Sequence, residues 1–270
     1  MRLLGSLWPQ MVTVARILVI GGLDPSGGAG ITADARVLQL HGAQALPIVT
    51  ALTVQNRFGF TRCEPVADDL VRAALTAAIA DGPIHAIKLG LLASAGQADW
   101  LAEWLSPFAQ HVPIVVDPVL SATAGGYDSP VALAKSYRQQ LVPLATVFTP
   151  NLLELAAVFG DEPLARSFAS GCSSVLTKGG HGAGATLQDE LAFQDGVQRY
   201  QHQRLLVGSV HGTGCALASS LAALLVQGHS LTTAVQLAID YVQRCLSAMA
   251  LEQAAAHPRP LQLVSGTVLR

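Results

Sequence analysis

Charged residues are scarce in this chain. Only 13% of its 270 residues are Asp, Glu, Lys or Arg, whereas 51% are apolar and the mean hydropathy is +0.43. So apolar a chain either spans a membrane or buries most of its helices and strands. No uninterrupted apolar stretch is long enough to cross a bilayer. We therefore predict no membrane contact and a sheet of parallel strands that is buried on both faces.

The chain also lacks an excess of positive charge and closely spaced pairs of cysteines. The formal net charge is −2 and no basic cluster occurs, which argues against a nucleic-acid partner. The cysteines stand far apart, without the paired spacing of a metal site: Cys63, Cys172, Cys215 and Cys245. They predict reduced thiols and a cytoplasmic location. The first 14 residues, with an apolar piece broken by Pro9, are too weak for a secretory signal, and Met11 is a candidate start.

The chain does contain a regular alternation of short β-branched runs and helical segments. We predict strands at 17–20, 46–54, 86–89, 114–116, 146–149 and 174–177, with an antiparallel pair at 185–193 and 199–207. Helices are predicted at 31–40, 67–80, 97–105, 129–141, after Asn151, at 215–226 and at 231–255. The fold class is therefore α/β, with helices on both faces of a mostly parallel sheet. We expect one domain over 1–270, with an N-terminal extension at 1–14 and a tail at 257–270.

Polar residues follow several of these strands. In such sheets, ligands bind beyond the carboxyl ends of the strands, so these residues should converge there: Asp24, Gln55, Asp117, Asn151 and Lys178.

The glycine-rich loop 22–30 matches neither of two familiar nucleotide-binding motifs. No Gly-Lys pair occurs, which excludes a Walker loop. No Asp or Glu occurs between Asp34 and Glu64, so the acidic residue that would bind the ribose in a Rossmann fold is absent.

The stretch from His211 to Cys215 precedes an apolar helical run without Pro, Gly or charge. Gly212, Thr213 and Gly214 would leave free backbone N–H groups at the positive end of this helix, which predicts an anion hole. A cysteine in such a first turn should have a lowered pKa, so Cys215 is a candidate base. The alternative from these residues alone is a glycine-rich turn with a buried cysteine.

Lysine occurs only at positions 88, 135 and 178. Lys178, beside Gly179 and Gly180 at a strand end, is a candidate phosphate contact. Asn151 and Glu154 stand three apart at a helix start, and Glu154 could hold magnesium through water, with Asp117 as a second candidate. An amide at Gln55 could both donate to and accept from a heteroaromatic ring. Together these residues predict a phosphoryl-transfer site.

The motifs occur in an order that resembles the hydroxymethylpyrimidine and phosphomethylpyrimidine kinases of thiamine biosynthesis. They are Asp24-Pro25-Ser26-Gly27-Gly28-Ala29-Gly30 with Ala33-Asp34, Thr50-Ala51-Leu52 with Gln55-Asn56, Lys88-Leu89-Gly90, Asp117-Pro118-Val119, Thr149-Pro150-Asn151-Leu152 with Glu154, Lys178-Gly179-Gly180-His181 and His211-Gly212-Thr213-Gly214-Cys215. The match covers about 17–250.

The resemblance implies a ribokinase-like three-layer α/β sandwich, ATP, Mg²⁺ and two successive phosphorylations of a pyrimidine alcohol. It implies that Gln55 bonds the aminopyrimidine ring and that Cys215 stands where related kinases carry an aspartate base. Gly22 and Asp34 match positions near the substrate, and Leu91 falls where a methionine often faces the ring. A homodimer is also implied. The loop 121–126 departs from the family pattern, which leaves the lid contacts unassigned.

Two other interpretations stay open at this point. One is a pyridoxal kinase of the same superfamily. The other is a non-catalytic pyrimidine-binding regulatory protein on a kinase scaffold. Turnover of the pyrimidine alcohol compared with pyridoxal separates the first from our prediction, and ADP release separates the second.

Overall fold

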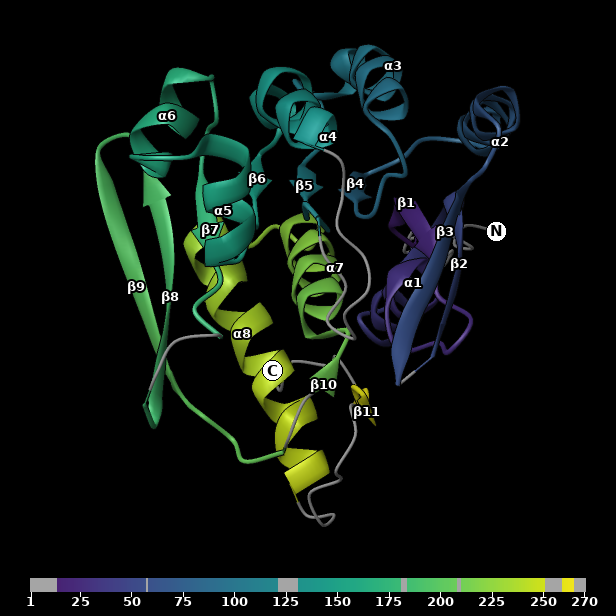
Figure 1. The fold of residues 1–270 in the computed structure, drawn as a ribbon. Helices are drawn as coiled ribbons and strands as arrows, with labels where there is room; N and C mark the ends of the chain where they lie inside the picture. The colour runs from purple at the N-terminus through teal and green to yellow at the C-terminus, as the bar shows by residue number, and fades with distance from the viewer. Residues whose placement is uncertain are drawn as a thin grey trace, which may run out of the picture.

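The computed structural model describes residues 14–56, 58–120, 131–180, 184–207, 210–250 and 259–264 (Figure 1). Their main sheet has nine strands in the order β3-β2-β1-β4-β5-β6-β7-β8-β9. The strands are β1 Arg16–Leu23, β2 Gln44–Asn56, β3 Gly59–Pro65, β4 Ala86–Leu89, β5 Ile114–Val116, β6 Val147–Phe148, β7 Val175–Thr177, β8 Thr186–Phe193 and β9 Gly196–Gln203. A small second sheet pairs β10 (Val210–His211) with β11 (Arg259–Pro260).

The centre of the sheet is parallel, from β2 through β1, β4, β5 and β6 to β7. Antiparallel strands stand only at the edges, where β3 pairs with β2, and β8 and β9 follow β7. The mostly parallel α/β sheet predicted from the sequence is therefore confirmed, as is the antiparallel pair near 185–207.

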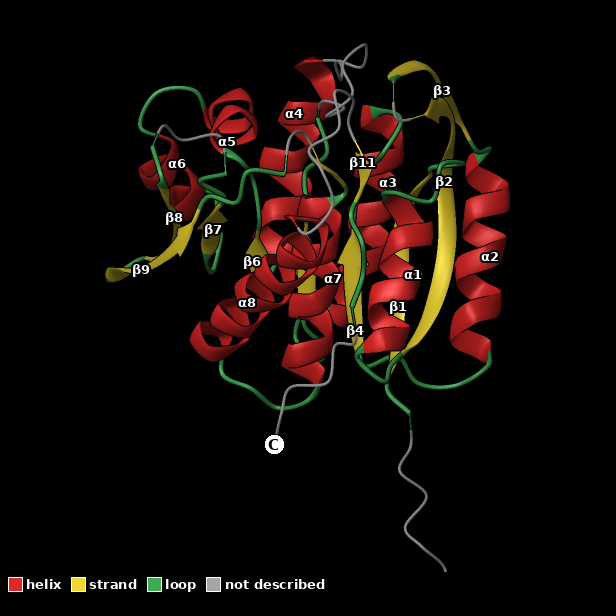
Figure 2. Cartoon of the chain, turned by 90° about the horizontal axis from the view of Figure 1, so that it is seen from below, coloured by secondary structure: helices red, strands yellow, loops and turns green. Residues whose placement is uncertain are grey.

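Helices cover both faces of the sheet, and Figures 1 and 2 show the three layers. The helices are α1 Gly30–Leu40, α2 Asp68–Ala80, α3 Ala95–Leu105, α4 Val131–Ser136, α5 Leu152–Phe159, α6 Pro163–Ala169, α7 Thr213–Val226 and α8 Leu231–Ala250. Alternate residues of one strand enter opposite layers: Ile17 and Val19 pack with α1, α7 and α8, whereas Leu18 and Ile20 pack with α2 to α5. Burial on both faces explains why the strands are so apolar. No helix among the described residues is long and apolar enough to cross a membrane.

Several boundaries differ from prediction. The edge strand β3 was missed because Phe60 is its only buried residue, so it has no alternating pattern. Helix α6 was missed for a similar reason, with Ser167 alone buried. The helix predicted at 129–141 is α-helical over Val131–Ser136 and continues as one π-helical turn at Tyr137–Leu141. β9 ends at Gln203, four residues before the predicted end at 207.

Three earlier predictions fall on residues that the structure does not describe. They are the N-terminal extension up to residue 13, the loop 121–126 and most of the tail at 257–270. The predicted end of the last helix, between 251 and 255, also lies outside the described residues.

Candidate active site

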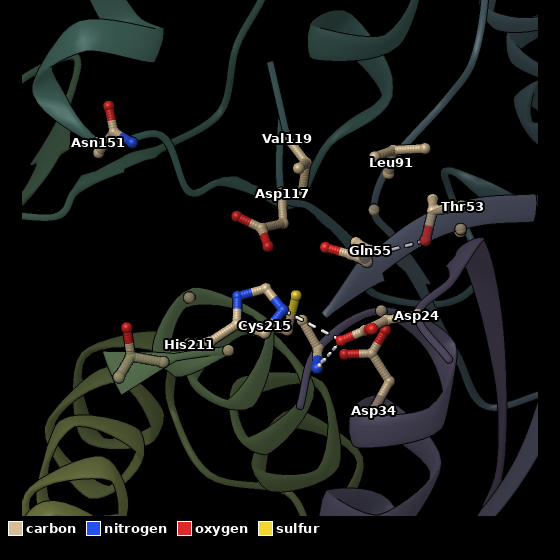
Figure 3. A pocket seen from close by; sticks show the side chains of 18 of the residues that line it. Asp24, Asp34, Thr53, Gln55, Leu91, Asp117, Val119, Asn151, His211 and Cys215 are labelled. Carbon is tan, nitrogen blue, oxygen red and sulfur yellow. Dashed lines mark hydrogen bonds and ion pairs between the residues drawn. The ribbon is translucent and has the colours of Figure 1, made fainter. Parts of the chain in front are cut away.

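A pocket of about 520 Å³ opens at the carboxyl ends of the central strands (Figure 3). Almost all the residues that the sequence singled out line it: Gly22, Asp34, Gln55, Leu91, Asp117, Asn151, Glu154, Lys178, Gly180, Gly212, Thr213, Gly214 and Cys215. Gly179 does not line the pocket. A Cβ added there would collide with the Gln188 carbonyl oxygen, so Gly179 is pressed against β8 instead.

The floor of the pocket is the start of α7, as the glycine pattern predicted. Gly212 has φ +93° and lies so close to the loop before α1 that an added Cβ would collide with the Gly28 carbonyl oxygen. Only glycine fits both this dihedral angle and this contact. An added Cβ on Gly214 would lie 3.2 Å from the Lys178 ammonium. A helix N-terminus and a cation therefore share one small region, which favours a bound phosphate.

Lys178 also joins two carboxylates of the pocket lining. Its Nζ donates to Asp117 Oδ1 at 2.7 Å and lies 3.8 Å from Glu154 Oε2. The side chain is only 16% exposed, so this lysine is not an ordinary solvated one. Burial alone would raise the pKa of Asp117, but the Lys178 and Lys88 ammonium groups outweigh it and lower that pKa. For Glu154 the burial effect dominates and raises the pKa.

Glu154 also caps a helix, as its spacing from Asn151 suggested. Glu154 Oε2 accepts from the Asn151 backbone N–H at 2.8 Å, and Asn151 Oδ1 accepts from the Glu154 backbone N–H at 2.9 Å. This reciprocal pair fixes the start of α5. Within the described residues, no group of three His, Cys, Asp or Glu side chains gathers to cage a metal. Two carboxylates beside a phosphate site do fit Mg²⁺, which keeps water ligands and binds substrate phosphates.

The prediction of a lowered pKa at Cys215 is wrong. Burial raises the pKa of its thiol to about 12, although the Lys88 ammonium partly opposes this. Cys215 is half-buried and lines the pocket. The loss of hydration outweighs the effect of the helix start, because desolvation penalises the charged form of a group. The thiol is therefore neutral in the resting protein.

Comparisons with known proteins bear directly on this site. The family model described as phosphomethylpyrimidine kinase matches residues 24–258. The chain belongs to the phosphomethylpyrimidine kinase family. It is 37% identical over 253 residues to the hydroxymethylpyrimidine/phosphomethylpyrimidine kinase of Mycobacterium bovis, covering 90% of this chain and 92% of that one. This kinase is thus a phosphotransferase with the ribokinase-like fold.

Solved structures agree with this assignment. The phosphomethylpyrimidine kinase of Clostridium difficile superposes with a TM-score of 0.73 at 28% identity, covering 85% of this chain and 98% of that one. A pyridoxal kinase from Staphylococcus aureus, solved in complex with ADP, gives a TM-score of 0.77 at 26% identity, covering 86% and 88%. The fold is thus shared with pyridoxal kinases, and the choice of substrate must come from the pocket.

Among the residues predicted to bind the substrate, Gln55 belongs to β2 and its Nε2 donates to Thr53 Oγ1 at 2.9 Å. Leu91 stands near Gly22, where an added Cβ would come within 3.0 Å of Leu91 Cδ2. The absence of a side chain at Gly22 therefore makes room for Leu91 at the pocket wall. Phe60 of β3 lines the same pocket and was missed together with its strand.

Asp34 lines the pocket, but its carboxylate is not free for a ligand. Its side chain is 0% exposed, Oδ2 accepts from Lys88 Nζ at 2.9 Å, and Oδ1 accepts from Ser219 Oγ at 2.7 Å. Its direct contact with substrate stays a prediction, and what the geometry shows is a buried ion pair with Lys88. The scarcity of lysine was the only sequence signal for this pair, since the partners stand 54 residues apart.

A second link that the sequence did not reveal joins the two glycine-rich loops. Asp24 Oδ2 lies 3.0 Å from His211 Nε2 and accepts from the Ala29 backbone N–H at 2.8 Å. Burial opposes ionisation of Asp24, but hydrogen bonds from His211, Ser26 and Ala29 prevail and lower its pKa. Asp24 therefore holds the loop before α1 against the loop before α7.

Proposed function

We propose that this kinase uses ATP to phosphorylate 4-amino-5-hydroxymethyl-2-methylpyrimidine and then its monophosphate, as part of thiamine biosynthesis. The observation that supports the proposal is that one pocket is lined both by residues suited to bind phosphate and by a residue suited to bind a ring. Lys178 and the α7 start supply a phosphate site, and Gln55 supplies an amide for a ring. The names of relatives at 36–37% identity support the pyrimidine substrate. The ADP complex of the staphylococcal relative supports ATP.

In this proposal Lys178 holds phosphate oxygens, with Asn151 and the Gly179-Gly180 loop on the nucleotide side. The backbone N–H groups of Gly212 to Cys215 bind the negative charge that develops on the transferred group. Cys215 Sγ receives the proton of the attacking hydroxyl. Because its pKa is about 12, the thiol must first give its own proton to solvent water at the open pocket that it lines. The nearby Lys88 ammonium stabilises the resulting thiolate electrostatically, and the substrate proton then restores the thiol.

Mg²⁺ completes the nucleotide site in the proposal, with Asp117 and Glu154 as its protein partners, directly or through water. When bound, the metal neutralises the phosphates during transfer. Lys178 Nζ lies 2.7 Å from Asp117 Oδ1 and 3.8 Å from Glu154 Oε2, so the two carboxylates are close enough to share a cation. In the proposal Mg²⁺ binds these carboxylates beside the Lys178 ammonium or in its place.

We propose further that residues 1–270 act as one domain, that the kinase is a homodimer and that it works in the cytoplasm. All four cysteines are free thiols, which is typical of a reducing compartment. The apolar side chains of Leu52 and Val54 on β2 are exposed, and a partner subunit would cover them in such a dimer.

The test is a coupled assay of ADP release with three acceptors: the hydroxymethylpyrimidine, its monophosphate and pyridoxal. We expect turnover of both pyrimidines at a higher kcat/KM than of pyridoxal. Faster turnover of pyridoxal, which the similarity to pyridoxal kinases makes the main alternative, would reverse the assignment. Pyrimidine binding without ADP release would instead indicate a regulatory protein.

A further inference from the structure

The hydroxyl of Thr53 lies between a backbone carbonyl and the amide of Gln55. Thr53 Oγ1 donates to the Leu23 carbonyl oxygen at 2.8 Å and accepts from Gln55 Nε2 at 2.9 Å. A hydroxyl has one hydrogen, and a backbone carbonyl can only accept. Once that hydrogen is given to Leu23, Oγ1 presents only lone pairs to Gln55. The nitrogen of the amide, and not its oxygen, must therefore face Thr53.

The carbonyl that sets this direction is itself fixed. Leu23 is the last residue of β1, it pairs with Leu52 of the neighbouring β2, and its side chain packs against the core. Thr53 is only 8% exposed. If the amide were reversed, two oxygens would meet at Thr53 unless its hydrogen left Leu23. Either outcome loses one of the two hydrogen bonds made by the buried Thr53 hydroxyl, which is unfavourable.

The fixed amide leaves Gln55 Oε1 for the pocket. Figure 3 shows this oxygen directed into the open space, with the bond to Thr53 on the other side. We propose that Thr53 is a specificity-determining positioning residue. By orienting Gln55, it makes the pocket select a ring that carries a hydrogen-bond donor, such as an exocyclic amine, over a ring with a carbonyl at that position. This inference rests on the proposed function, since it concerns the ring-binding side of the same site.

The decisive experiment compares two ligands by titration calorimetry. They are 4-amino-5-hydroxymethyl-2-methylpyrimidine and its 4-oxo counterpart, whose exocyclic group accepts. For the unaltered kinase we expect the amino compound to bind about tenfold more tightly or better. Thr53→Val keeps the shape but loses the hydroxyl, so Gln55 can turn to suit either ligand. Its ratio of dissociation constants should fall to about 1. Thr53→Ser keeps the hydroxyl and should keep the preference.

The ratio separates specificity from simple damage, because a poorly folded pocket would lose both ligands equally. The thermal unfolding of each variant is measured first, so that both ligands are titrated at a temperature at which the variant is folded. A Thr53→Val variant that keeps the full preference would overturn the role of Thr53 while leaving the proposed function intact. If the unaltered kinase binds neither pyrimidine, the proposed function itself is wrong and this inference goes with it.

Discussion

Asp189 Oδ1 accepts a hydrogen bond from the backbone N–H of Gly179 at 2.6 Å, and this bond ties the loop after β7 to strand β8. The other carboxylate oxygen lies 3.1 Å from His202 Nε2 on β9. An imidazole that donates there accepts at Nδ1, where Gln243 Nε2 of α8 lies at 2.9 Å. A chain of partly buried polar contacts thus runs from α8 to the residue after Lys178. It holds the proposed nucleotide side of the pocket in place.

Replacing Asp189 by Ala should weaken ATP binding more than it slows the chemical step. Gly179 and its neighbour Lys178 would lose their anchor, although neither the reacting atoms nor the ring site is touched. We expect KM for ATP to rise about three- to tenfold with a small change in kcat. Steady-state kinetics against ATP concentration measure this.

Two further variants serve as controls for Asp189. Asp189→Asn keeps an oxygen for the Gly179 N–H and should retain most of the affinity. Glu190→Ala removes the neighbouring carboxylate, whose contacts are with Arg199 and Gln188 on the same two strands, and should leave the KM for ATP unchanged. An unchanged KM in Asp189→Ala would show that the loop stays in place without this bond.

Gly179 and Gly180 give a matched pair for stability. Both are glycines of one loop, yet an added Cβ at Gly179 would collide with the Gln188 carbonyl oxygen, and one at Gly180 would meet nothing within 4 Å. Gly179→Ala must therefore displace backbone, at a cost of about 1–3 kcal/mol, whereas Gly180→Ala should unfold at nearly the same urea concentration as the unaltered protein. Equal midpoints for the two variants would contradict the contact.

This pair also shows what the sequence could and could not predict. Positions after strand ends were predictable, because parallel strands bring their carboxyl ends to one edge and the strand signals were strong. Thus Gln55, Asp117 and Lys178 do line one pocket. The sequence could not say which of Gly179 and Gly180 faces the pocket. That depends on the close approach of β8, which local pattern does not encode.

Partnerships between distant residues were the main omission. Thr53, Asp24 and Lys88 each act through a residue or carbonyl that is remote in the chain: Leu23, His211 and Asp34 respectively. The error at Cys215 has the same origin. The local rule for a helix start predicts an acidic thiol, but burial among elements far apart in the sequence decides its pKa.

The raised pKa of Cys215 makes a prediction about pH. A group with a pKa of about 12 is almost wholly protonated near neutral pH, and its thiolate fraction grows about tenfold per pH unit until that value is reached. If the thiolate takes the substrate proton, kcat should rise steadily through about pH 6–9 without a plateau. Alkylation of Cys215 by iodoacetamide, followed by mass spectrometry, should show the same rise, with half-buried Cys63 as an internal reference.

Two variants test the same assignment. Cys215→Ser should lower kcat by about 10²–10⁴-fold, because a hydroxyl is a much weaker acid than a thiol. Cys215→Asp supplies a carboxylate that is ionised at lower pH, and its residual activity should lose the steep rise with pH. Full activity in Cys215→Ser would show that the thiol takes no part in the proton transfer. A plateau of alkylation near neutral pH in the unaltered kinase would show that the pKa of the thiol is not raised.

Removing one partner of the Lys88–Asp34 ion pair should lower the stability of the protein more than replacing both charged side chains. Both side chains are at most 1% exposed, so Lys88→Met leaves a carboxylate in the core without its counter-charge, which costs about 3–5 kcal/mol. In the double variant Lys88→Met with Asp34→Asn, no charge remains, and the amide oxygen can still accept from Ser219. Most of the lost stability should therefore return in urea unfolding.

Lys135→Met, at an exposed site on α4, controls for the loss of a lysine and should change the stability little. If the double variant were as unstable as Lys88→Met alone, the uncompensated charge could not be the cause, and the loss would have to come from packing around the shorter methionine side chain at position 88.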